Sequence, residues 1–341
     1  MTMASQSRRN GPGGLPESGA ARIEYVQVDG LVAMKIARHS HEEAGGLMDF
    51  AQGVLLGMVD GRGVEVTNCF PYPRHGEEEE YEEHEYQMEM LRQMRAVNID
   101  HLTVGWYQAS PFGSFFTRPL LESQFSYQEN IEESILLVYD PIKAQRGFFS
   151  LRALRLTEAA FALCRDAEYT LDSFKNCKCS YSDLFEEIPV RIRNSHLINL
   201  LQSELDELVP SHAPAGKQFL DMSTAFSLER QLQATMECVD NLNQETSKLL
   251  SHQRQVMRQQ QQKTLALAKR AQENSSRKQR GEPPLPDDDI HKQYKPLIPP
   301  ARLDSVLLAG QVEAHCNQMA KFSTQNLAKL FMSDALQKKD Q

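Results

Sequence analysis

Alternating and periodic apolar positions divide the first part of the chain into short strands and helices. Residues 23–28 alternate apolar and polar side chains, as a half-buried strand does, and a helical spacing of apolar residues follows over 31–44. Two apolar runs, 54–59 and 64–70, are separated by Asp60-Gly61-Arg62-Gly63. An Asp-Gly pair between two such runs predicts a β-hairpin.

The run of residues 102–107 is the expected central strand. It follows a helical pattern over 86–97 and ends abruptly at Gln108-Ala109-Ser110-Pro111. A further helix is expected around 120–125, and the apolar run 135–139 predicts a buried strand. Because a strand that stops at a loop facing a helix is a common place for chemistry, the loop after residue 107 is the first candidate site.

Three later elements complete the expected domain. Residues 148–156 and 188–193 are strand candidates, although the first alternates imperfectly. Ser195 is placed to cap a helix whose apolar face runs to Leu208. The chain to this point predicts a mixed α+β domain, a central β-sheet flanked by helices.

The pattern changes after residue 208. Apolar residues recur at intervals of three, four and seven from Leu228 to Val256, in a background rich in Gln and Asn, which predicts a long amphipathic helix. Repeated prolines then interrupt helical structure before a second amphipathic helix. The expected organisation is an N-terminal tail 1–22, a core domain 23–160, an extension 161–208, a long helix 217–275, a Pro-rich linker 276–301 and a C-terminal helix 302–337.

The narrow apolar seams of these two helices predict a helical partner, because an exposed seam of that length is rarely left bare. The residues expected to face a partner bundle are Leu308, Val312, Cys316, Met319, Phe322, Leu327, Leu330 and Phe331. An alternative stays open, in which the C-terminal helix folds back on its own domain across the proline-rich linker.

Composition and charge narrow the setting. The chain of 341 residues has a formal charge of −9, which argues against nucleic-acid binding through bulk electrostatics. Six scattered cysteines without a disulfide spacing favour a reducing compartment. The tail lacks the apolar region of a signal peptide, and no apolar run approaches the roughly 18 residues of a membrane helix. We therefore expect a soluble, cytoplasmic protein, with the nucleus as the alternative.

Two charged stretches stand out. The acidic run from Glu77 to Glu85 is typical of a solvated loop, with contact to a basic partner as the alternative. For the basic stretch from Lys263 to Arg280, a solvated, disordered segment is at least as well supported as one that approaches RNA.

The order strand, helix, hairpin, helix, strand resembles the MPN (JAMM) domain, as do Gly53-Val54-Leu55-Leu56-Gly57 and Val104-Gly105-Trp106-Tyr107. Active members of that family are zinc isopeptidases that remove ubiquitin-like modifiers. The resemblance implies a site in which two histidines and an Asp hold zinc, while an upstream Glu takes a proton from the bound water.

None of these roles is present at the matching positions. Gln108 and Ser110 occupy the positions of the two histidines. Leu121 occupies the position of the Asp, and Phe50 that of the Glu that acts as the general base. The helper serine of the family falls at Arg118. An amide, a neutral hydroxyl and two apolar side chains neither bind zinc nor move a proton. We therefore expect a pseudoenzyme with no catalytic residue, metal or cofactor.

Other metal ligands are too dispersed to replace the missing ones. The histidines of this region are His39, His41, His75, His84 and His101. Cys177-Lys178-Cys179 lacks a second pair at zinc spacing and is expected to be a reduced pair in a loop. The sequence also contains no phosphate-binding loop and no dinucleotide fingerprint.

Several separate segments, in order along the chain, resemble the h-subunit family of eukaryotic translation initiation factor 3. They are Val26–Val32, Tyr86–Met90, Val97–Leu102, Ser123–Gln128, Asn194–Asn199, Arg280–Pro286 and Gln325–Met332. The resemblance implies a scaffold subunit of that factor, which binds the small ribosomal subunit and helps recruit mRNA. The implied partners are a second MPN subunit and the PCI subunits, whose C-terminal helices gather into a bundle.

Two other hypotheses remain. In the first, the chain is an inactive MPN subunit of a different assembly, of the proteasome-lid or signalosome type. In the second, it is a zinc isopeptidase with atypical ligands. Fold alone does not distinguish an inactive MPN subunit of another assembly from an initiation factor subunit, since these assemblies share an architecture. Tightly bound zinc would identify a zinc isopeptidase.

Overall fold

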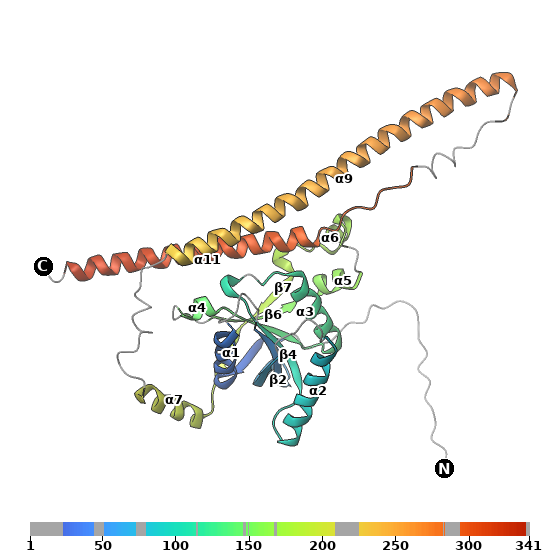
Figure 1. The fold of residues 1–341 in the computed structure, drawn as a ribbon. Helices are drawn as coiled ribbons and strands as arrows, with labels where there is room; N and C mark the ends of the chain where they lie inside the picture. The colour runs from blue at the N-terminus through green and yellow to red at the C-terminus, as the bar shows by residue number, and fades with distance from the viewer. Residues whose placement is uncertain are drawn as a thin grey trace, which may run out of the picture.

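The computed structural model describes residues 23–43, 51–72, 80–113, 115–145, 148, 150–166, 169–208, 225–281, 283 and 294–338. It confirms the expected mixed α+β class, a sheet with flanking helices followed by long C-terminal helices (Figure 1). Phe50, the segment 44–50 around it and the tail 1–22 lie outside the described residues, as do residues 77–79 of the acidic run.

The domain is built on one eight-stranded sheet in the order β7-β6-β5-β4-β2-β3-β1-β8. The strands are β1 Tyr25–Asp29, β2 Gln52–Asp60, β3 Gly63–Pro71, β4 Thr103–Ala109, β5 Ile135–Tyr139, β6 Leu151–Leu156, β7 Phe185–Ile188 and β8 Val190–Arg193. The predicted hairpin is confirmed: β2 and β3 pair antiparallel down to Asp60 and Gly63, with Gly61 at a φ of 57° in the turn.

The helices are α1 Gly30–Glu43, α2 Glu80–Ala96, α3 Arg118–Asn130, α4 Pro141–Gln145, α5 Glu158–Asp166, α6 Leu171–Cys177, α7 His196–Leu208, α9 Ala225–Arg280 and α11 Leu303–Gln337. Two short 3-10 turns, η1 Pro111–Gly113 and η2 Tyr181–Asp183, complete the list. Ser195 caps α7 as predicted, because its Oγ accepts a 3.4 Å hydrogen bond from the backbone N–H of Ile198.

The single strand expected over 188–193 is instead two strands on opposite edges of the sheet. Residues before Pro189 form β7, which pairs with β6, and residues after it form β8, which pairs with β1. The carbonyl of Pro189 accepts a 3.0 Å hydrogen bond from the N–H of Val26. Because one residue separates two edge strands, the sheet curls strongly on itself, and the local alternation of the sequence gives no sign of this.

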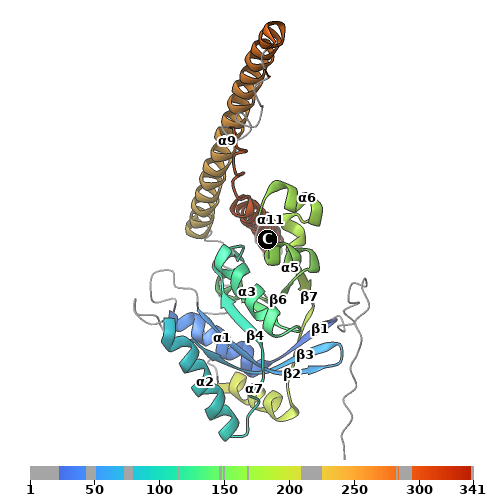
Figure 2. The same ribbon diagram turned by 90° about the vertical axis from the view of Figure 1, so that its right-hand side faces the viewer.

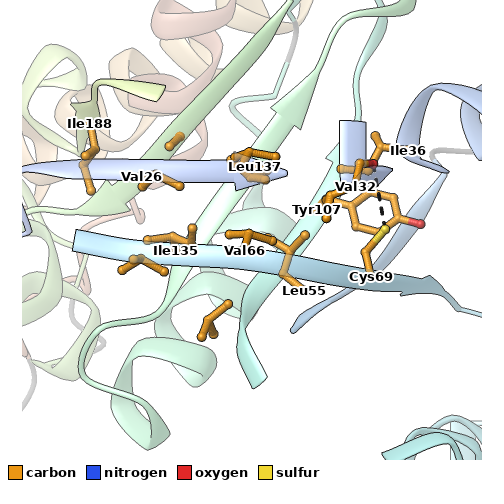
Figure 3. Close-up of a cluster of buried hydrophobic side chains, with 14 of the residues drawn as sticks. Val26, Val32, Ile36, Leu55, Val66, Cys69, Tyr107, Ile135, Leu137 and Ile188 are labelled. Carbon is orange, nitrogen blue, oxygen red and sulfur yellow. Dashed lines mark hydrogen bonds between the residues drawn. The ribbon is translucent and has the colours of Figure 1, made fainter. Parts of the chain in front are cut away.

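The largest core cluster lies between one face of the sheet and α1. Val32 and Ile36 of α1 are fully buried against Cys69 and Tyr107 (Figure 3). Two smaller clusters cover the other side of the sheet. In one, Phe70 is packed by residues of α2, and in the other Trp106 is packed by residues of α3.

The two long helices lie above this domain. α11 runs across it, and α9 starts along α11 in the opposite chain direction and then extends well beyond the domain (Figure 1). The view turned by 90° shows the same separation of the far end of α9 from the sheet (Figure 2). No helix within the part of the chain that the structure describes is both long and apolar enough to cross a membrane.

Candidate functional site: the loop after β4 and the helix that covers it

Strand β4 occupies the centre of the sheet, antiparallel to β2 and parallel to β5. Its close approach to β5 explains the glycine of the Gly-Trp-Tyr sequence. A Cβ at Gly105 would lie 1.9 Å from the carbonyl oxygen of Ile135, and the φ of Gly105 is 153°. Only glycine fits here. Gln108 is near the end of β4, and Ser110 is the first residue after it.

Gln108 and Ser110 are buried side chains with structural surroundings. Gln108 is 2% exposed, and its Oε1 accepts a 3.3 Å hydrogen bond from Nε2 of Gln52. Ser110 is 0% exposed, and its backbone N–H donates to the carbonyl of Tyr139 at 2.8 Å. Ser110 Oγ makes no hydrogen bond within the described residues. Both side chains are therefore part of the packed interior at the end of β4.

The remaining positions of the zinc pattern are filled differently. Leu121 is fully buried in a cluster that also contains Leu303 and Leu307 of α11. Arg118 lies at the start of α3, and its Nε makes a 2.8 Å salt bridge with Glu122. Phe50, which is expected at the position of the general-base Glu, lies outside the described residues. The apolar side chain at 121 thus joins two parts of the chain.

These residues do not fit a zinc ion. A zinc site of this family needs imidazole and carboxylate donors, and the matching positions offer an amide, a hydroxyl and an aliphatic side chain. Among the residues that the structure describes, no group of three His, Cys, Asp or Glu side chains is arranged to hold a metal ion.

The other metal candidates lie apart from this loop. His39 lies on α1, and its Nδ1 is 2.9 Å from the hydroxyl of Tyr107. Cys179 is buried beside α6, and burial raises the pKa of its thiol to about 11, so the neutral form dominates near pH 7. Side chains of His75 and His84 are outside the described set.

Helix α11 covers the loop after β4. Gly310 packs against the ring of Phe116, so closely that an added Cβ would lie 3.3 Å from it. The side chain of Gln311 links three elements, because its Nε2 donates to the carbonyl of Phe116 at 2.7 Å while its Oε1 accepts from Cys238 Sγ of α9 at 3.3 Å. The loop that holds catalytic ligands in zinc enzymes here supports a helix.

Further along α11, Gln318 Nε2 donates a 3.1 Å hydrogen bond to Oδ2 of Asp140. Asp140 follows β5 and caps α4 through the backbone N–H groups of Ile142 and Lys143. Burial raises the pKa of this carboxyl, and the hydrogen bonds from Lys143, Gln318 and Ile142 oppose the shift. The contact ties α11 to the edge of the degenerate site.

A cavity of about 740 Å³ remains between α11 and the strands β5, β6 and β7. Its charged side chains have both signs, with Lys143, Arg152 and Lys321 facing Glu187 and Glu313. Arg152 and Glu187 already form two hydrogen bonds of 2.8 and 2.9 Å with each other, and these lower the pKa of Glu187. Apolar side chains such as Phe115, Leu154 and Phe322 also line it, so the cavity between α11 and the domain is of mixed character.

The eight residues expected to face a partner bundle fall into two groups along α11. Phe322 is 7% exposed and lines the cavity beside the domain, whereas Leu308, Val312 and Met319 are partly buried. The others are exposed: Cys316, Leu327, Leu330 and Phe331, the last of them at 68%. The first part of α11 folds back on its own domain, as the alternative interpretation proposed, and the last part does not.

What sequence reasoning missed is the identity of the anchoring residues. Leu303 and Leu307 are buried in the cluster around Leu121, and Gly310 allows the close approach to Phe116. A signal was present in the glycine, since glycine within an apolar helix pattern often marks a packing contact. The pattern alone did not say what the helix packs against.

The fold and the loop after β4 define a protein of the MPN class. Residues 21–133 match the family described as JAB1/Mov34/MPN/PAD-1 ubiquitin protease, and residues 144–341 match the family described as C-terminal region of eIF3h. The second match alone spans more than half of the chain and includes both long helices.

Full-length relatives agree with these matches. The H subunit of eukaryotic translation initiation factor 3 from Nematostella vectensis is 47% identical over 336 residues, 98% of each chain. The protein of the same name from Bombyx mori is 47% identical over 322 residues, 94% of each chain. The H-B subunit of the same factor from Danio rerio is 46% identical over 316 residues, 92% of this chain and 94% of its own. The chain belongs to the H-subunit family of eukaryotic translation initiation factor 3, which confirms the resemblance inferred from its segments.

Proposed function

We propose that the protein is a non-catalytic scaffold subunit of the translation initiation factor 3 complex. The observation that carries this proposal is the exposed apolar end of α11, formed by Leu327, Leu330 and Phe331, on a chain whose relatives are named as subunits of that factor. Apolar side chains clustered on one helix end are costly to leave in water, and a partner helix removes that cost.

The absence of catalysis is part of the same proposal. Gln108, Ser110 and Leu121 are buried in packing contacts, and none of them is a zinc ligand or a general base at neutral pH. The helix α11 lies over the loop that a zinc peptidase leaves open for its substrate. In this protein the loop acts as a support for α11.

The expected partners are the second MPN subunit and the PCI subunits of the complex, and through them the small ribosomal subunit and, indirectly, mRNA. A cytoplasmic location follows from that role. The part of α11 from Leu327 to Phe331 is the proposed contact with the helices of other subunits. The part from Leu303 to Phe322 positions them by holding the helix to the MPN domain.

Co-purification from cells tests this proposal. Leu327→Gln, Leu330→Gln and Phe331→Gln are combined in one tagged variant, and the matched control combines Leu171→Gln, Leu297→Gln and Ile298→Gln, which are also exposed apolar residues. We expect the first variant to lose the other subunits and the control to retain them. Equal recovery of the subunits by both variants contradicts the assignment of the α11 end as an interface.

Elemental analysis tests the absence of catalysis separately. The purified chain is expected to contain no stoichiometric zinc after dialysis near neutral pH, because the residues at the end of β4 are poor ligands. One tightly bound zinc ion per chain would overturn the non-catalytic part of the proposal and leave the interface part untouched.

A further inference from the structure

The charge of the chain is unevenly distributed, and the far end of α9 is its most basic part. Between residues 254 and 281 there are eight Lys and Arg residues and a single acidic residue, so this stretch carries +7 while the whole chain carries −9. The basic residues are Arg254, Arg258, Lys263, Lys269, Arg270, Arg277, Lys278 and Arg280. A positive segment on an acidic protein concentrates a local field that attracts anions.

The structure places this stretch away from the MPN domain, and Gln259 within it donates a 2.6 Å hydrogen bond from Nε2 to the carbonyl of Lys295, in the segment before α11. The beginning of α9 packs on α11, as the contact between Cys238 and Gln311 shows. The part beyond residue 254 extends past the domain (Figures 1 and 2). Most of its basic side chains are exposed, among them Arg258, Lys269 and Arg280. The positive charge is therefore presented on a projecting helix.

The geometry of the array suits a long polyanion. A helix rises 1.5 Å per residue, so the basic residues from 254 to 280 are spread over about 39 Å. The eight basic positions together span about two-thirds of the helix circumference, because neighbouring residues are separated by about 100°. A small anion would contact one or two of these cations, whereas a nucleic-acid backbone contacts many at once.

The side chains that are missing from the stretch indicate which nucleic acid fits. Residues 254–281 contain no Phe, Tyr or Trp, the side chains on which unpaired bases commonly stack. They do contain Gln260-Gln261-Gln262, which are exposed and whose amides are able to hydrogen-bond to ribose 2′-hydroxyls. Base readout is therefore disfavoured, and contact with the phosphates and sugars of an A-form duplex is favoured.

An anionic membrane fits the same stretch less well. Helices that lie on membranes combine a basic face with a continuous apolar face rich in Trp, Phe or Leu. The large apolar residues between 254 and 280 are only Val256, Met257, Leu265 and Leu267. Met257 and Leu265 are each more than half exposed and are eight residues apart. They do not form a continuous surface for acyl chains.

We propose that the far end of α9, residues 254–280, binds double-stranded RNA through its phosphate backbone without sequence preference. The site needs no other subunit, because every residue in it belongs to this chain. The inference thus goes beyond the scaffold role, and RNA affinity and subunit recovery are separate measurements that can fail independently.

The test measures binding of the full-length chain to a 20-base-pair RNA duplex by fluorescence anisotropy over a range of salt concentrations. The test variant combines Arg258→Gln, Lys269→Gln, Lys278→Gln and Arg280→Gln, which remove four exposed charges without lowering helix propensity much. The charge-matched control combines Arg95→Gln, Arg165→Gln, Lys175→Gln and Arg193→Gln, all exposed on the MPN domain and its extension.

We expect the test variant to bind at least about tenfold more weakly and to lose about half of the salt dependence, since each phosphate contact contributes about 0.9 to the slope of log K against log salt. The control should bind like the unmodified chain. A duplex of unrelated sequence should bind equally well, and a single strand of the same length more weakly.

Three outcomes would overturn the proposal. The first is no RNA binding by a chain whose circular dichroism shows intact helices. The second is equal loss in the two variants, which would indicate bulk charge. The third is binding to vesicles of phosphatidylserine, or to polyglutamate as an acidic-protein probe, that is tighter than binding to the duplex and is lost in the test variant alone.

Discussion

The indole N–H of Trp106 on β4 donates a 2.9 Å hydrogen bond to Oε1 of Gln124 on α3, and both side chains are buried. Gln124 also donates to the carbonyl of Ser134 at 3.3 Å, so one amide joins the central strand, the helix and the loop before β5. A buried donor that loses its acceptor is removed from water without a hydrogen bond in return, which lowers the free energy of unfolding. The stability of the domain is therefore expected to depend on this hydrogen bond.

Gln124→Leu is expected to destabilise the domain by about 1–3 kcal/mol, because the Trp106 N–H is left without a partner. In a Trp106→Phe background the same change should cost less, since the unpaired donor is no longer present. Urea unfolding of the four proteins of the cycle measures both effects. If Gln124→Leu lowers the free energy of unfolding equally in both backgrounds, the hydrogen bond between Trp106 and Gln124 does not contribute to stability.

Leu121→Ala is expected to cost about 2–5 kcal/mol, as is usual when a fully buried leucine is truncated. The reason is its position between the MPN domain and the buried start of α11. Leu102→Ala is the control, because Leu102 is 61% exposed, and its cost should be within about 0.5 kcal/mol. Similar unfolding midpoints for the two variants would contradict the packing role given to Leu121.

Gly310→Leu should lift the first half of α11 from the domain, because even a Cβ at this position meets the ring of Phe116 at 3.3 Å. Hydrogen exchange of the backbone measures this directly. We expect faster exchange from Leu303 to Phe322 in the variant. Ala328→Leu places the same bulk on an exposed position of α11 and should leave exchange unchanged. Equal exchange in the two variants would argue that α11 is not held by this contact.

His315 predicts a loss of stability in mild acid. The side chain is 2% exposed on α11, and burial lowers its pKa from the ordinary value of 6.5. The folded state therefore favours the neutral ring, and the unfolded chain takes up the proton first. Stability from this group is present above pH 6.5 and is lost as pH falls below it, until the lowered pKa of the folded state is reached.

The measurement compares melting temperatures at pH 7.5 and pH 5.5. His315→Gln removes the titrating group and should reduce the drop between the two pH values, while His41→Gln, at an exposed position of α1, should not. An unchanged drop in the His315 variant would assign the acid sensitivity to other groups.

Local patterns predicted the elements of the domain well, for a physical reason. The hairpin from β2 to β3 and the buried strand β5 depend on alternation and turn residues that are close together in the chain. The division of 188–193 between two sheet edges depends on pairing partners more than 150 residues apart, such as Val26 with Val190. No short window contains that information.

The same distinction applies to the candidate site. The expectation that Gln108 and Ser110 do not bind zinc depends on residue type alone, so it could be stated from the sequence. The surface that receives α11 depends on Phe116, Asp140 and Leu121 meeting in space. A periodic seam predicts that a helix has an apolar side, and it does not predict which neighbour covers that side.

The division at Pro189 also sets an order of events during synthesis on the ribosome. Once Leu156 has emerged from the ribosome, β6 and β1 are both open edges, and each pairs only with a strand that comes later in the chain. At about 5–20 residues per second, the residues up to Arg193 take about 2–7 s more. During that interval the nascent domain exposes two unpaired strands to other chains. Emergence of the short segment around Pro189 then closes both edges together.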